Sequence, residues 1–116
     1  MNDVANPDTV RRSANVFVHD ELAGRLTELG DGTYGFRYLS AYLAKPNPVA
    51  VSLTLPLREE IYLSDMLFPY FQGLLSEGST RTLQCRMHKV DSDDAFGLLL
   101  ATGADAIGAV YVEAEQ

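Results

Sequence analysis

The sequence contains one cysteine, Cys85, and no tryptophan. A single cysteine excludes an internal disulfide framework. Nothing near the start reads as a basic segment followed by an apolar one with a cleavage site. No apolar run approaches the roughly 18 residues of a membrane span. We therefore expect a cytoplasmic protein with no membrane partner.

Positive charge is also scarce. Nine Lys and Arg residues face sixteen Asp and Glu residues, so the formal net charge is -7 and the isoelectric point is near 4.6. Neutralising a phosphate backbone requires clustered Lys and Arg side chains. We therefore expect no direct binding to nucleic acid. An acidic surface favours solubility and can steer a protein toward a basic partner.

The two histidines, His19 and His88, do not stand at metal-ligand spacing from each other or from Cys85. Neither a metal nor another cofactor is therefore expected. Cys85 and His88 are three residues apart and could touch on one helix as a nucleophile pair. No third orienting group is evident, however, and a lone thiol near a core stripe is more often inert.

With 116 residues, 47% of them apolar and 22% charged, the chain matches one globular domain. Residues 1–14 are polar and without period, and we expect them to form a loosely ordered lead-in. The folded domain should span residues 15–112, and residues 113–116 should form a polar tail.

The first half of the domain has the alternation and turn residues of strands. Residues 16–19 and 23–29 are strand-like runs, and the Asp-Gly turn in residues 30–32 leads to a third. In that third run three aromatic residues fall on one side: Tyr34, Phe36 and Tyr38. These runs predict a three-stranded meander, whereas residues 39–44 could continue the strand or close it with a turn.

The clearest strand pattern lies in residues 50–55. Val51, Leu53 and Leu55 would point one way and the intervening Ser and Thr residues the other, until Pro56 ends the strand.

The stretch from Leu67 to Gly78 is the one around which we expect the chain to be organised. Phe68, Phe71 and Leu75 have the spacing of one helical face, and Gly78 stands where a helix would stop. Such a helix most simply places its aromatic face in a core.

Two more helices and a final strand should follow. A helix capped by Ser79 or Thr80 would bury Leu83, Met87 and Val90. Residues 91–94 would cap a third helix whose buried face is Phe96, Leu99 and Leu100. Residues 108–112 read as a returning strand. The order predicts an α+β domain: a mainly antiparallel sheet, formed by the N-terminal meander and the C-terminal strand, packed with two or three short helices.

Residues 30–35, Gly-Asp-Gly-Thr-Tyr-Gly, match a G-x-G-x-x-G pattern, and Lys45 lies downstream. An aromatic strand follows the glycines where a dinucleotide fold needs a helix. The catalytic-loop Asp and Asn and the Asp-Phe-Gly of a kinase are absent. The motif therefore predicts a hairpin turn.

Two surface features remain as candidates for partner binding. Arg81, Arg86, His88 and Lys89 gather positive charge, either as a solvated face or as a docking face for an acidic surface. Residues 76–79, Ser-Glu-Gly-Ser, form a polar connection between two expected helices. That connection is either a pair of caps or a loop that enters the cleft of another protein.

Several ordered motifs strongly resemble the N-terminal subdomain of HipA-type toxin kinases. They are Val51-Ser52-Leu53-Thr54-Leu55-Pro56-Leu57, residues 67–78 (Leu-Phe-Pro-Tyr-Phe-Gln-Gly-Leu-Leu-Ser-Glu-Gly), residues 94–103 (Asp-Ala-Phe-Gly-Leu-Leu-Leu-Ala-Thr-Gly) and Gly108-Ala109-Val110. The resemblance covers residues 15–112. Ser76 stands where the family usually has proline, and the chain ends where the kinase core of that family begins.

A chain of this size resembles the HipS-type antitoxins of three-part HipBST toxin-antitoxin systems. The resemblance implies a protein without enzymatic activity that neutralises a HipT-like serine/threonine kinase, with a HipB-like DNA-binding protein completing a ternary complex. Alternatives are a scaffold subunit that links the kinase to the HipB-like protein without inhibition, and the N-terminal fragment of a full-length HipA kinase. Expected partner-binding residues are Phe68, Phe71, Ser76, Glu77, Gly78, Ser79, Thr80 and Arg81.

Overall fold

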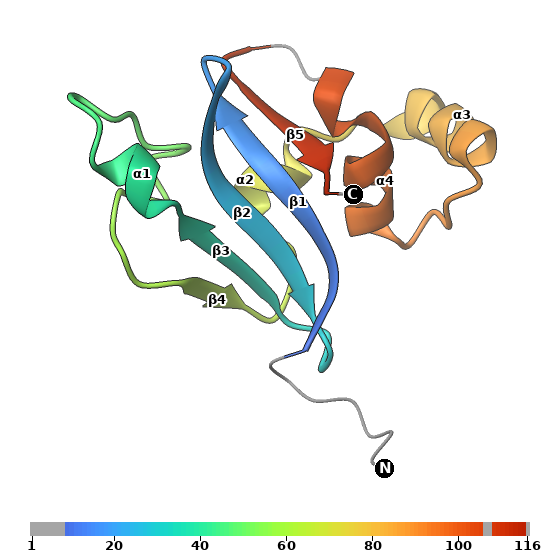
Figure 1. Cartoon of the computed structure of the whole chain (residues 1–116). Helices are drawn as coiled ribbons and strands as arrows, with labels where there is room; N and C mark the ends of the chain where they lie inside the picture. The colour runs from blue at the N-terminus through green and yellow to red at the C-terminus, as the bar shows by residue number, and fades with distance from the viewer. Residues whose placement is uncertain (1–8, 106–107, 116) are drawn as a thin grey trace.

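A computed structural model of the chain describes residues 9–105 and 108–115. Figure 1 shows a five-stranded sheet in the order β4-β3-β2-β1-β5, in which every pair of neighbouring strands is antiparallel. The strands are β1 (Val10–Val18), β2 (Glu21–Leu29), β3 (Tyr34–Tyr38), β4 (Tyr62–Ser64) and β5 (Val110–Ala114). The predicted meander and the returning strand are therefore confirmed.

Tight turns set the register of the meander. Gly32, with φ of 89°, allows the turn after β2, where the Leu29 amide donates to the Thr33 carbonyl at 2.8 Å. The glycine-rich motif is thus a hairpin turn, as predicted, and Lys45 pairs with Glu21 at 3.2 Å. β1 begins at Val10, so residues 10–14 belong to the sheet, and the expectation of a loose lead-in is wrong for them.

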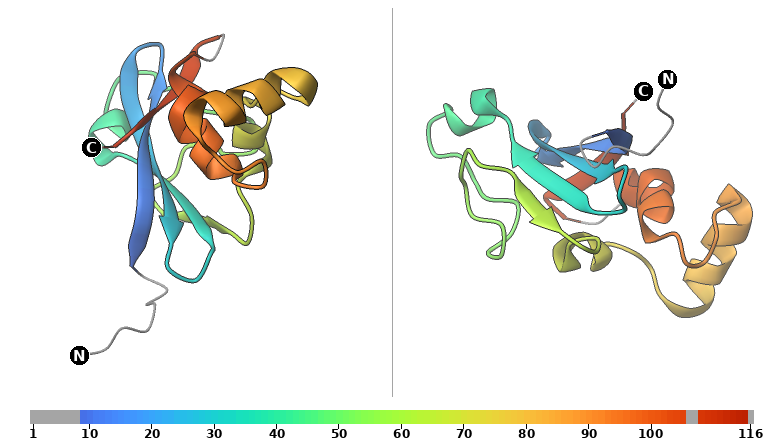
Figure 2. Two further views of the ribbon diagram at one scale, coloured as in Figure 1. Left: turned by 90° about the vertical axis from the view of Figure 1, so that its right-hand side faces the viewer. Right: turned by 90° about the horizontal axis from the view of Figure 1, so that it is seen from below.

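Four helices accompany the sheet in the described residues: α1 (Ser40–Leu43), α2 (Pro69–Gln72), α3 (Gly78–His88) and α4 (Ala95–Thr102), which runs into a 3-10 turn at Gly103–Asp105. In Figure 2, α2 and α4 lie on one face of the sheet, and α3 extends beyond α4 away from the strands. None of the helices described is long and apolar enough to cross a membrane.

The core lies between the sheet and the two helices that cover it. Phe36 of β3 packs on Phe71 of α2, with ring centroids 5.7 Å apart, and Tyr34 meets Phe96 of α4 edge-on at 5.8 Å. Phe36, Phe71 and Phe96 are fully buried. The aromatic side of β3 is therefore the one that holds the helices to the sheet, as its alternation predicts.

The organising stretch differs from its prediction. Phe68, Phe71 and Leu75 are buried as expected, but α2 ends at Gln72, and Gly78 begins the next helix instead of ending this one. Gly73 caps α2, and its amide donates to the Pro69 carbonyl at 2.9 Å. Leu75 therefore reaches the core from the turn that follows α2, where its amide donates to the Gln72 carbonyl at 3.1 Å.

No strand forms at residues 50–55, where the prediction was wrong. Val51 and Leu55 are buried, but Leu53 is fully exposed, and the only pairing described is an isolated bridge between Ser52 and Leu55. The buried Tyr38 hydroxyl donates to the Leu55 carbonyl and accepts from the Val51 amide. This hydroxyl satisfies backbone groups that a strand would have paired with a neighbour.

Two helical stripes were only partly predicted. In α4, Phe96 and Leu99 are buried as expected, but Leu98 is buried where Leu100 was expected. In α3 the prediction was wrong, because Leu83 and Met87 are 57% and 68% exposed, and Val90 is half-buried.

Candidate interaction surface

Residues 76–81 comprise the end of the link between α2 and α3 and the first turn of α3, and we call them the connection. The connection lies between two buried side chains. Leu75 precedes it and Cys85 follows within α3, and each is 7% exposed. Residues 77–80 are exposed, whereas Ser76 and Arg81 are half-buried. Gly78 has a φ of 63°, and a Cβ there would meet nothing within 4 Å, so the space beside Gly78 is open.

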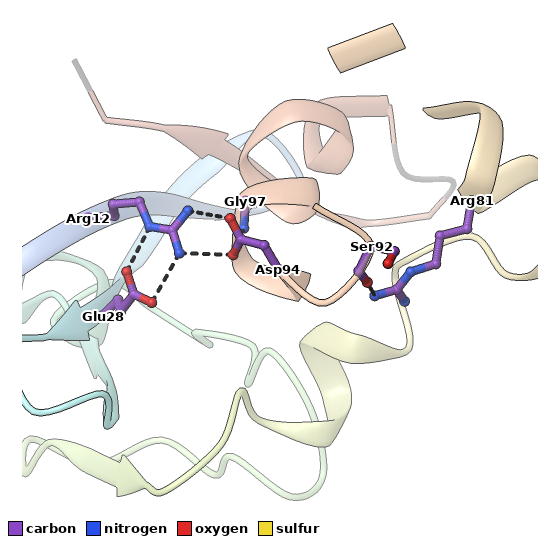
Figure 3. A network of polar contacts seen from close by, with 6 residues as sticks. All are labelled: Arg12, Glu28, Arg81, Ser92, Asp94 and Gly97. Atoms are coloured by element: carbon purple, nitrogen blue, oxygen red, sulfur yellow. Dashed lines mark hydrogen bonds and ion pairs between the residues drawn. The ribbon is translucent and has the colours of Figure 1, made fainter. Parts of the chain in front are cut away.

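Arg81 ties the first turn of α3 to the segment before α4. Its Nη2 atom donates to the Ser92 carbonyl at 3.2 Å (Figure 3). Residues 76–81 are thereby held relative to α4 as well as by Leu75 and Cys85.

A second arginine fixes α4 to the sheet. Arg12 of β1 donates to both carboxylate oxygens of Glu28, at 2.7 and 3.0 Å, and to both of Asp94, at 2.9 and 3.0 Å (Figure 3). Asp94 also accepts from the Gly97 amide at 3.0 Å and so caps α4. We call Arg12, Glu28 and Asp94 the Arg12 clamp.

Hydrogen bonds within the clamp favour the charged forms of Arg12 and Asp94. Hydrogen bonds to Glu28, and then to Asp94, raise the pKa of Arg12. The hydrogen bond from Arg12 lowers the pKa of Asp94 below its ordinary value. The Glu28 side chain is only 11% exposed, so its charge depends on Arg12 for compensation. The clamp thus joins β1, β2 and α4 into one frame that carries α3.

Phe68 and Phe71 do not offer the expected apolar surface to a partner. They are 8% and 0% exposed and belong to the core. The expectation that they anchor a contact is wrong for this structure, because reaching them would require opening the domain. Their part in the site is indirect, since they hold α2 against the sheet.

Exposed apolar side chains occur instead on α3. Leu83 and Met87 lie one helical turn apart, and Arg86, His88 and Lys89 at the C-terminal end of the helix are also exposed. We call these five residues the α3 surface. Apolar contact area and positive charge together suit an acidic surface with apolar side chains, in a chain whose net charge is -7.

Cys85 and His88 do not form an accessible nucleophile pair. Cys85 is buried and His88 is exposed, so the thiol is not presented to solvent. The inert interpretation of this cysteine is the one that its burial supports.

Sequence reasoning missed the Arg12 clamp, because Arg12 was assigned to the lead-in. One signal was available: Glu28 follows Leu26 on the inward side of β2, and an acidic side chain at an inward position needs a cationic partner. Asp94 was correctly expected among the caps of its helix.

Fold and surface together define a small α+β domain that carries an exposed, partly apolar helix on a rigid frame. Its sequence matches the profile of the HipA N-terminal domain over residues 14–113. The chain therefore belongs to the HipA N-terminal domain family.

Two relatives show this domain in chains of different length. A protein of Haemophilus influenzae described as uncharacterized is 34% identical over 105 residues, which cover 90% of this chain and 94% of that protein. "Putative kinase Y4mE" of Sinorhizobium fredii is 33% identical over 105 residues, which cover 90% of this chain but 25% of that protein. The chain thus spans a quarter of this second relative.

A solved structure has the same fold. The N-terminal domain of HipA toxin is 29% identical, with a TM-score of 0.70, and the alignment covers 100% of this chain and 98% of that one. The family likeness is to this domain and not to a kinase catalytic region.

Proposed function

We propose that this protein is an antitoxin, without enzymatic activity of its own, that binds and neutralises a HipT-like serine/threonine kinase. A HipB-like DNA-binding protein would complete the complex, as in tripartite HipBST-type systems. The observation that carries the proposal is the distribution of the domain. The aligned domain covers 25% of a relative named as a putative kinase. It covers 94% of another relative, which is about as long as this chain.

That distribution supports docking between separate chains. A domain that one relative carries covalently has a surface that fits the rest of that polypeptide. A separate copy of the domain can use the same surface to bind a kinase that lacks it, at the cost of the association entropy that the covalent link avoids.

Residues 76–81 and the α3 surface are the contact that we propose. The exposed connection would enter or cover the active cleft of the kinase, and Leu83 and Met87 would supply apolar anchors beside it. Arg86 and Lys89 would face carboxylates of the kinase. Arg81 and the Arg12 clamp act as positioning residues, because they hold the connection and α3 in place without needing to touch the partner.

Co-expression with the kinase gene tests the function. We expect growth to recover when the chain is induced beside the kinase, and the purified pair to show a reduced rate of phosphoryl transfer. Binding with an unchanged kinase rate would favour the scaffold, and a kinase reading frame continuous with this sequence would favour a fragment of HipA. Persistent toxicity without any binding would refute the proposal.

Exposed apolar residues offer a matched test of the surface. The L83S/M87S variant should weaken kinase binding strongly, because truncating central apolar anchors costs about 2 kcal/mol or more each. L53S/M66S is the control, since Leu53 and Met66 are also exposed, at 100% and 60%, and lie outside α3. Equal affinity of the two variants, measured by calorimetry, would exclude the α3 surface from the contact.

A further inference from the structure

Helix α3 is attached to the rest of the domain by little buried surface. Of its eleven residues only Cys85 is buried, and eight are exposed. It packs chiefly against α4 and extends beyond it, away from the strands (Figure 2). The shorter α4, by contrast, buries Phe96, Leu98 and Leu99 completely. Since tertiary packing supplies most of the stability of a helix in a protein, we expect α3 to be the less stable of the two.

The start of α3 adds little stability of its own. Glu77 occupies the N-cap position, but its side chain makes no capping hydrogen bond within the described residues, and the first turn contains no acidic residue. Gly78 and Thr80 lie in that turn, and both are weaker helix formers than alanine. A helix of eleven residues with such a start is marginal unless other elements hold it.

The end of α3 is strained. Lys89 follows the helix with a φ of 56°, in the left-handed region that costs free energy for a residue with a Cβ. The Val90 amide then donates to the Cys85 carbonyl at 2.9 Å, which closes the last turn. Unfolding of the helix relieves this strain, so the strain favours the open state.

Opening α3 would leave the rest of the domain intact. The main side-chain contacts to be lost are the packing of Cys85 and the exposed hydrogen bond from Arg81 to the Ser92 carbonyl. The Arg12 clamp joins β1 and β2 to the cap of α4 and contains no residue of α3. The aromatic contacts between the sheet and the helices α2 and α4 likewise lie outside α3.

We propose that α3 unfolds and refolds locally while the sheet, α2 and α4 stay folded. Leu83 and Met87 share one face only while the helix is formed, so the α3 surface exists only in the closed state. A partner that binds this surface therefore selects the closed helix, and its apparent affinity falls with the fraction of molecules that are closed. The helix thus acts as a conformational switch whose stability sets that fraction.

Native-state hydrogen exchange of the full, purified chain without any partner tests the proposal. We expect the backbone amides of α3 to exchange about a hundredfold or more faster than paired amides at the centre of β1 and β2, yet more slowly than in an unstructured chain. Low concentrations of urea should speed exchange in β1 and β2 but scarcely change it in α3, because local opening exposes little surface.

Two variants separate local from global opening. The partners of the Tyr38 hydroxyl, Val51 and Leu55, lie outside α3, so Y38F destabilises the closed and the α3-open states alike. It should speed exchange in β1 and β2 about tenfold and leave α3 unchanged. C85A removes the buried side chain of α3, whose packing is lost on opening, and should speed exchange in α3 about tenfold.

Three results would overturn the proposal. Equal protection of α3 and the centre of β1 would mean that α3 unfolds only with the whole domain, and an equal effect of Y38F on both would mean the same. Exchange of α3 at the rate of an unstructured chain would mean that the helix is not formed in the free protein. Since no kinase is present in these measurements, their failure leaves the proposed kinase contact untouched.

Discussion

Replacing Arg12 with methionine should destabilise the domain measurably. The change keeps much of the apolar stem and removes the guanidinium that compensates Glu28 and Asp94. Loss of charged hydrogen bonds to a carboxylate that is 11% exposed costs about 1.5 to 3 kcal/mol. The pair with Asp94 is about one third exposed on both sides, so solvent screening limits its share to about 0.5 to 1 kcal/mol. We expect a total loss of about 2 to 4 kcal/mol.

Urea unfolding of R12M measures this loss, and R11M is the matched control, because Arg11 is the exposed neighbour on the same strand. The double variant R12M/E28Q should be more stable than R12M, since the buried carboxylate has lost its charge. If R12M unfolds within about 0.5 kcal/mol of R11M, the Arg12 clamp does not hold α4 to the sheet as we infer.

The clamp also predicts a pH dependence. The pKa of Asp94 is lowered in the folded protein, so its stabilisation is present above the ordinary value of 3.8 and is lost as the pH falls below it. The difference in stability between R12M and the unchanged protein should therefore shrink as acid titrates Asp94. A difference that stays constant from neutral pH to pH 3, in urea unfolding, would contradict this assignment.

The further predictions concern the core and the start of α3. Y38F should cost about 1 to 3 kcal/mol in urea unfolding, because the Leu55 carbonyl and the Val51 amide lose their partner. Burial raises the pKa of Tyr38 from the ordinary value of 10.0 to about 12. An ultraviolet titration should therefore show a tyrosine that ionises about two pH units above the ordinary value, and Y38F should remove this signal. F71A should cost about 3 to 5 kcal/mol by the same unfolding assay, and a loss under 1 would show that Phe71 is not central to the core. G78A meets no atoms but forces alanine to a φ of 63°, so calorimetry should show about 1 kcal/mol of destabilisation; no loss would mean that the turn relaxes.

Much of the sheet was predictable because its signals are local. Alternation and an Asp-Gly turn predicted three strands, and Asp94 was expected to cap its helix; both signals need only a few neighbouring residues. Of the candidate site, the polarity of residues 76–79 indicated exposure, which residues 77–79 show, whereas Ser76 is half-buried. The helical spacing of Phe68 and Phe71 predicted that they lie in the core, and they are buried there. They are therefore not part of the exposed interaction surface.

Long-range contacts decided the rest. Residues 50–55 have the alternation of a strand, but the Tyr38 hydroxyl takes up the Val51 amide and the Leu55 carbonyl, so the segment folds as a turn and exposes Leu53. Alternating apolar residues form a buried strand face only where a neighbouring strand pairs with the segment. Within the part of the chain described, no strand pairs with residues 50–55.

The sequence by itself determined the α+β class, the meander and the family, because these depend on short-range spacing and on ordered motifs. Only the tertiary structure decided which apolar stripes are covered. Leu83 and Met87 have core spacing yet remain exposed, on a helix that extends beyond α4 and away from the strands. The tertiary structure likewise placed Arg12 beside Asp94, 82 residues away, and Arg25 opposite Arg37. Burial and charge pairing depend on which surfaces the fold brings together, and a local pattern does not contain that information.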